Sequence, residues 1–190
     1  MDIKEIISKI HVDAGIDPDL RMAKNADELK NGKNMLLLSR FAEKHSLKGE
    51  LCAALCFCGR FNDASGSNTA FSVGAQILRD CYGKIDSFFA PADDTELFNA
   101  TAAILKAYKK NVKVTAVYKK MLPDGIDLGL IDRVVGLDGD KAKEIQNEVF
   151  STENIVIGPL AAAALGTACD EIKNADDAHS RTVVLFPDIS

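Results

Sequence analysis

Three closely spaced cysteines are the first residues whose type and spacing suggest chemistry. Cys52, Cys56 and Cys58 resemble a zinc-binding cluster, because thiolates are preferred zinc ligands. They lie, however, in and beside the apolar run from Leu51 to Phe57, which predicts a buried strand. A strand that rises about 3.3 Å per residue separates Cys52 from Cys58 by roughly 20 Å, too far for one metal ion. We therefore predict buried core thiols and no metal site.

The histidines and a group of lysines do not define a site either. His11, His45 and His179 lack the spacing of metal ligands or of a catalytic triad, so we assign them no role. A lysine-rich segment could bind an anion, but a solvated helix end is the interpretation that we favour. Lys109 and Lys110 would complement the negative end of the helix dipole. The segment comprises Lys106, Lys109, Lys110, Lys113, Lys119 and Lys120.

Two further segments place small or acidic residues where a helix is predicted to begin. The loop Ser65-Gly66-Ser67-Asn68-Thr69 resembles a phosphate- or carboxylate-binding loop, although an ordinary loop with an N-cap is the interpretation that we favour. The segment Ala92-Asp93-Asp94-Thr95-Glu96 follows a predicted strand, where doubly wound folds bind anions. Its own carboxylates would stabilise the helix N-terminus and repel a phosphate. This segment therefore predicts helix capping.

The spacing of apolar residues predicts the elements that position these segments. Ile3, Ile6, Ile7 and Ile10 form the stripe of an amphipathic helix, and residues 16–33 predict a linker with one short helix. Further on, short apolar strands alternate with helices, as in a parallel sheet covered on both faces. The predicted strands are 51–57, 85–90, 112–118, 132–137, 155–158 and 182–186, and the predicted helices are 34–46, 71–82, 95–110, 140–150 and 160–173.

This order of elements predicts an α/β protein, a three-layer α/β/α sandwich with a mostly parallel sheet. We divide the chain into an N-terminal helical extension and linker, residues 1–48, and an α/β domain, residues 49–190. The length of 190 residues, with 47% apolar and 27% charged residues, fits one globular domain.

Composition also excludes several classes of function. A net charge of -5 argues against a nucleic-acid partner, which would need a clustered basic surface. The weakly polar stretch from Ile155 to Cys169 is interrupted by Gly158, Pro159 and Gly166, so no membrane span is predicted. The charged N-terminus does not resemble a secretory signal, and five cysteines suggest reduced thiols. We therefore expect a cytoplasmic protein.

From about Leu51 to Ser190, several short segments resemble the second half of cysteine synthase (O-acetylserine sulfhydrylase), a fold type II pyridoxal-phosphate enzyme. The most specific match is LPDGIDLGLID, from Leu122 to Asp132, which is similar to the family's IPxNLDLSLID. The resemblance implies the fold of that family's large domain. The other matching segments are 74–77 with 83–86, which resemble GPEI…GKVD, 154–166, which resembles GLLVGISSGAALAAA, and 182–190, which resembles IVVVLPDSG.

The departures from the family pattern fall on its chemistry. The family's Schiff-base lysine and substrate-carboxylate loop belong to its first half, and residues 1–50 match neither. Its GTGGT phosphate loop is replaced here by ADDTE, residues 92–96, so that Thr95 alone carries over. The GISSGA segment, with its paired serines, becomes GPLAA, residues 158–162. The resemblance implies that Ser190 corresponds to the residue that faces the pyridine nitrogen in the family.

These departures imply a cysteine-synthase-like pseudoenzyme without cofactor, which acts as an interaction or regulatory module or binds a small ligand in the former cleft. The alternative is a pyridoxal-phosphate-dependent enzyme of cysteine synthase type in amino-acid metabolism, or one half of a split enzyme. No catalytic residue is assigned, and Thr95 and Ser190 are vestigial cofactor-binding candidates. The family's large domain packs against a smaller domain and a second subunit, so we expect a homodimer or a complex with a full-length relative.

Overall fold

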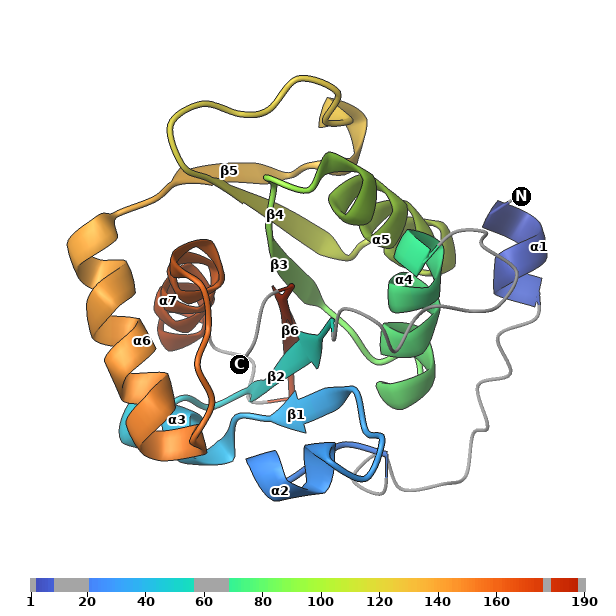
Figure 1. Ribbon diagram of the computed structural model, residues 1–190. Coiled ribbons are helices and arrows are strands. Elements are labelled where there is room, and N and C mark those ends of the chain that lie inside the picture. The colour runs from blue at the N-terminus through green and yellow to red at the C-terminus, as the bar shows by residue number, and fades with distance from the viewer. Residues whose placement is uncertain (1–2, 9–20, 57–68, 176–178, 188–190) are drawn as a thin grey trace.

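The chain forms a single mixed sheet of six strands in the order β1-β2-β6-β3-β4-β5 (Figure 1). The computed structural model describes residues 3–8, 21–56, 69–175 and 179–187. All neighbouring strands are parallel except the first pair, β1 and β2. The strands are β1 Met35–Leu37, β2 Glu50–Leu55, β3 Ser87–Pro91, β4 Lys113–Tyr118, β5 Arg133–Gly136 and β6 Arg181–Phe186.

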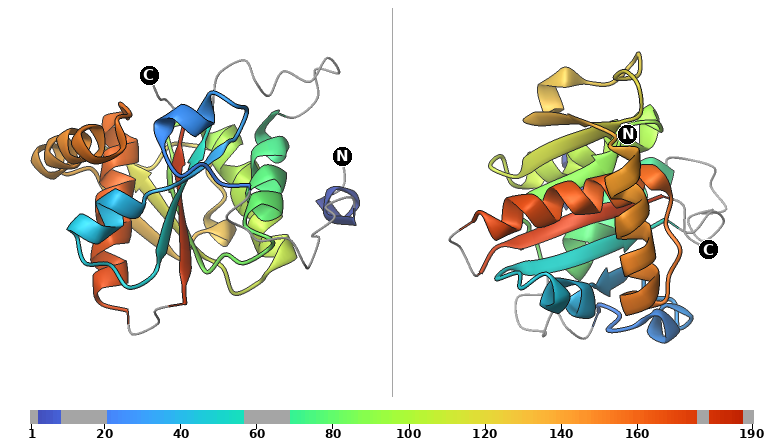
Figure 2. Two further views of the ribbon diagram at one scale, coloured as in Figure 1. Left: turned by 90° about the horizontal axis from the view of Figure 1, so that it is seen from below. Right: turned by 90° about the vertical axis from the view of Figure 1, so that its left-hand side faces the viewer.

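Helices cover both faces of this sheet, which confirms the predicted three-layer α/β/α sandwich (Figure 2). One outer layer holds α4 (Thr69–Asp80) and α5 (Thr95–Tyr108). On the opposite face, α7 (Pro159–Lys173) packs on β3, β4 and β6, and α6 (Gly139–Glu153) packs on α7. The strands predicted at 85–90 and 112–118 are β3 and β4, and they pair in parallel as expected, since Phe88 lies opposite Val114.

The near-continuous apolar strands follow from this double coverage. Successive side chains of a strand point to opposite faces, so odd and even positions must both be apolar when both faces are buried. Phe88 and Val183 accordingly belong to the core on the α4 and α5 side. Their neighbours Phe89 and Val184 belong to the core on the α7 side.

Helices α4 and α5 approach each other closely at Gly74. A Cβ atom at this position would lie 2.9 Å from the Cβ of Ile104, nearer than side chains pack. The turn that follows α4 closes at Gly83, as predicted. Its φ of 67° favours glycine, and its N–H donates to the Leu78 carbonyl.

The prediction of a helix over residues 34–46 is wrong in its first half. Residues Met35–Leu37 form β1, an antiparallel edge strand, and only Ser39–Lys44 form a helix, α3. The apolar residues Met35, Leu36 and Leu38 are fully buried, because they pair with β2 or pack beside it. Tertiary pairing therefore overrides the helical spacing of this segment.

The prediction of a strand over residues 155–158 is also wrong, because this described segment forms none of the six strands of the sheet. This segment connects α6 to α7 after Asn154, which adopts a left-handed conformation with φ of 58°. Ile155 and Ile157 are buried under the helices, and Val156 is exposed. The Ile157 carbonyl accepts a hydrogen bond of 2.7 Å from the Gln146 side chain of α6. Ile155 and Ile157 therefore pack in the core beside the helices and not in the sheet.

The N-terminal part of the chain packs on the same sandwich. Helix α1 (Ile3–Ser8) contacts α5, and Ile3 is partly buried against the core on that side. The short helix predicted in the linker is α2 (Ala26–Leu29), which Asn25 caps by accepting the Glu28 N–H at 3.1 Å. Ile10 lies outside the described residues. Within the described ranges, none of the helices combines the length and apolar character that a membrane crossing requires.

Candidate ligand-binding site

A small pocket lies at the edge of the sheet where the parallel strands end. Its volume is about 270 Å³. Ligands of open α/β sheets bind outside the carboxyl ends of the strands, so this is the expected place for a site. Its lining consists of Pro91, Asp93, Lys119, Leu137, Gly158, Pro159, Leu160, Ala161 and Pro187.

The lining residues come from the ends of four strands and from the start of α7. Pro91 ends β3, Lys119 directly follows β4, and Pro187 directly follows β6. Leu137 follows β5 and is held by a 2.8 Å hydrogen bond from its N–H to the Tyr118 carbonyl. Gly158 is the N-cap of α7, and Pro159 occupies the first turn, where its missing N–H costs nothing.

Two neighbouring aspartates give this edge its negative charge. Asp94 is the N-cap of α5, and its Oδ1 accepts the Leu97 N–H at 3.0 Å, which confirms the predicted capping role of this segment. Asp93 is exposed and lines the pocket. Lys119 is also exposed and lines the same pocket, so the pocket carries one charge of each sign.

The residues at this edge do not fit the phosphate of pyridoxal phosphate. A phosphate at the start of α5 needs free backbone N–H donors and a positive local field. Here the Asp94 carboxylate already accepts the Leu97 N–H, and Asp93 adds a second negative charge beside it. Both effects oppose an anion at this position.

Of the two candidates for cofactor binding, Thr95 can be placed, and Ser190 lies outside the described residues. Thr95 is the first residue of α5 and is half-buried, next to the pocket but not among the residues that line it. The structure instead brings Asp93 and Lys119 together. Sequence reasoning missed Lys119 as a site residue, although its place directly after a predicted strand was a usable signal.

Cys52, Cys56 and His45, which were also considered in the sequence, do not line this pocket. Cys52 is fully buried and Cys56 half-buried, whereas Cys58 and the Ser65-to-Asn68 loop lie outside the described residues. The described residues include no group of three or more His, Cys, Asp or Glu side chains placed to hold a metal ion. His45 pairs with Glu148 at 2.7 Å.

Two lysines of the basic segment have acidic partners. Lys109 contacts Asp86 at 2.7 Å, and Lys106 contacts Asp132 at 2.7 Å. Partial burial alone would raise the pKa of Asp132, but hydrogen bonds from Lys106 and the Val114 N–H lower it overall. These two of the six lysines are thus held by acidic partners in the fold.

A curated relative supports the resemblance seen in the sequence. No family model matches the chain. An O-acetylserine dependent cystathionine beta-synthase of Bacillus subtilis (strain 168) is 25% identical over 164 residues, which are 76% of this chain and 53% of that enzyme. The chain thus spans about half the length of the curated relative that it matches.

Solved structures have the same fold. An O-ureido-L-serine synthase matches with a TM-score of 0.59 and 19% identity, over 67% of this chain and 48% of that one. A hydrogen sulfide-producing enzyme from Fusobacterium nucleatum matches with a TM-score of 0.59 and 23% identity, over 68% of this chain and 51% of its own. The homologues and structural neighbours of this chain are therefore fold type II pyridoxal-phosphate enzymes of the cysteine synthase and cystathionine beta-synthase type, which it matches over about two thirds of its length.

Proposed function

We propose that this chain is a non-catalytic relative of the cysteine synthase type, which binds a small ligand without a phosphate group at the carboxyl edge of its sheet. The observation that carries the proposal is the pair of aspartates at the start of α5. Asp93 lines the pocket and Asp94 occupies the helix cap, where a phosphate would need free N–H donors. Binding at this edge would serve a regulatory or interaction role in the cytoplasm.

The first test is a spectrum of the purified chain with added pyridoxal phosphate. We expect no saturable aldimine absorbance band, and no single lysine labelled in preference to the others after reduction with borohydride, because the carboxylates disfavour the phosphate. The matched variant Asp93→Gly with Asp94→Gly should bind inorganic phosphate more tightly than the parent in a calorimetric titration. Asp138→Gly controls for the loss of an N-cap, because Asp138 caps α6 and does not line the pocket.

Two results would contradict the proposal. A reducible aldimine on Lys119, the lysine that lines the pocket, would favour the enzyme alternative instead. Equal phosphate affinity of the parent and the double-glycine variant would show that the aspartates do not exclude anions.

We also propose that the chain associates with a second copy of itself, or else with a full-length relative. Several large apolar side chains are exposed, including Met121, Leu128 and Phe150, and contact with a second chain would remove such side chains from water. Light scattering should give a mass near twice the monomer's 20.5 kDa. A monomer that also fails to bind a full-length relative in a mixing experiment would contradict both forms of this proposal.

A further inference from the structure

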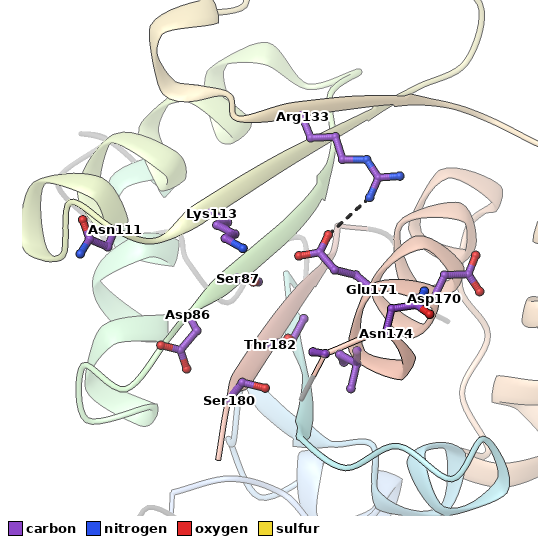
Figure 3. Close-up of a pocket in the computed structure, with 12 residues that line it drawn as sticks. Asp86, Ser87, Asn111, Lys113, Arg133, Asp170, Glu171, Asn174, Ser180 and Thr182 are labelled. Carbon is purple, nitrogen blue, oxygen red and sulfur yellow. Dashed lines mark hydrogen bonds and ion pairs between the residues drawn. The ribbon is translucent and has the colours of Figure 1, made fainter. Parts of the chain in front are cut away.

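A second, larger hollow lies at the opposite edge of the sheet, where the parallel strands begin (Figure 3). This groove has a volume of about 660 Å³, within the range of small-ligand sites. It runs between the first residues of β3, β4, β5 and β6 and the C-terminal end of α7. It is distinct from the pocket of the proposed function, which lies at the carboxyl ends of the same strands.

The sheet wall of the groove is polar because α7 ends before it covers the strand beginnings. Ser87 lies opposite both Lys113 and Thr182, so these three side chains share one face. Arg133 lies opposite Thr115, two residues beyond Lys113 on β4, and therefore shares that face. The sheet wall thus presents two cations, Lys113 and Arg133, beside two hydroxyl groups.

The helix wall of the groove is acidic. Asp170 and Glu171 lie in the last turn of α7, whose C-terminal end carries the negative pole of the helix dipole. Asp170 is already paired with Lys141. Glu171 contacts Arg133 across the groove at 3.4 Å, as the dashed line in Figure 3 marks.

The pair between Arg133 and Glu171 is weak. Its distance is long, and the two side chains are 55% and 30% exposed, so solvent screens their attraction. Beside it, the exposed Lys113 forms no salt bridge with another described residue, although its charge helps to lower the pKa of the Asp132 carboxyl. Asp86, also in the lining, has its two carboxylate oxygens occupied by Lys109 and the Arg181 N–H.

We propose that this groove binds a small zwitterion that carries a carboxylate at one end and an amine at the other. The ligand would insert between Arg133 and Glu171, and its carboxylate would bind Arg133 and Lys113. Its ammonium group would bind Glu171 near the negative end of α7. One weak ion pair is thereby exchanged for three ion-pair contacts, and each charge of the ligand lies beside an opposite charge of the groove.

The proposal is tested by titrating the chain with 6-aminohexanoate, with hexanoate and with hexylamine, while backbone amide shifts are followed by nuclear magnetic resonance. The zwitterion should bind most tightly, and its shifts should cluster at residues 86–87, 113, 133, 171–174 and 180–182. Lys113→Met should weaken the binding of 6-aminohexanoate and of hexanoate about tenfold. Lys110→Met is the matched control, because Lys110 is exposed nearby but does not line the groove. This variant should bind 6-aminohexanoate as tightly as the parent.

Glu171→Gln distinguishes a zwitterion site from a simple anion site. This variant should lose affinity for 6-aminohexanoate but keep or gain affinity for hexanoate. The proposal is overturned if no probe binds saturably at millimolar concentrations, if Lys110→Met weakens binding as much as Lys113→Met, or if Glu171→Gln leaves the preference for the zwitterion unchanged.

Discussion

Replacing Arg181 by alanine should lower the free energy of unfolding by about 3 kcal/mol. Arg181 is 5% exposed at the start of β6. Its Nε donates to Glu50 Oε2 at 2.6 Å, and its Nη1 donates to the Cys81 carbonyl at 3.1 Å. Truncation therefore removes packing from the core, together with one of the two hydrogen bonds that the Cys81 carbonyl accepts, the other coming from the Lys84 N–H. Urea denaturation measures the effect.

The partner residue provides the control for Arg181. Glu50 is about half exposed, so Glu50→Gln should cost less than about 1 kcal/mol, because its amide oxygen still accepts from Arg181. The loss of stability in Arg181→Lys should lie between those of Arg181→Ala and Glu50→Gln, since an ammonium group cannot reproduce the planar arrangement of donors. Equal losses in Arg181→Ala and Glu50→Gln would mean that the ion pair, and not the buried carbonyl and the packing, dominates.

Replacing Glu153 by alanine should lower the free energy of unfolding by about 1 to 3 kcal/mol. Glu153 ends α6 and is 2% exposed, and its Oε1 accepts the Phe41 N–H of α3 at 2.7 Å. Its loss leaves that buried N–H without an acceptor and separates two helices that contact each other. Glu153→Gln keeps an acceptor oxygen, so thermal or urea unfolding at neutral pH should find it at least as stable as the parent.

The pH dependence of the Gln variant follows from the pKa of Glu153. Burial raises this pKa above its ordinary value of 4.5, against the smaller effect of the Phe41 N–H. The folded chain then holds this proton to higher pH than the unfolded chain, so stability falls as pH rises from 4.5 through the folded pKa. The stability difference between Glu153→Gln and the parent should therefore grow in favour of the variant over this window. A difference that does not change with pH would contradict the raised pKa.

Much of the fold follows from local patterns along the chain. Phe88 and Phe89, or Val183 and Val184, are adjacent apolar residues in short runs separated by helices, and such runs indicate a parallel sheet covered on both faces. Gly83 after α4 and Asp94 at the start of α5 make their hydrogen bonds to backbone groups a few residues away. Such features are predictable because the interactions that cause them span only a few residues.

Features that depend on distant partners were not predictable. Met35 to Leu37 have a spacing that suits a helix, but the free edge of β2 makes them a strand. Ile155 to Gly158 have the composition of a strand, but they run between α6 and α7, and a side chain of α6 binds the Ile157 carbonyl. In both segments the competing states are close in local preference, and packing selects between them.

The sequence by itself determined the α/β class, the glycine that follows α4 and the aspartates that stand at the start of α5. Only the tertiary structure decided that Asp93 and Lys119 line one pocket, and that Lys113 and Arg133 face Glu171 across a groove at the other edge. The reason is geometric. Parallel strands bring their beginnings to one edge and their ends to the other, so residues far apart in the chain become neighbours only after the strand order and register are set.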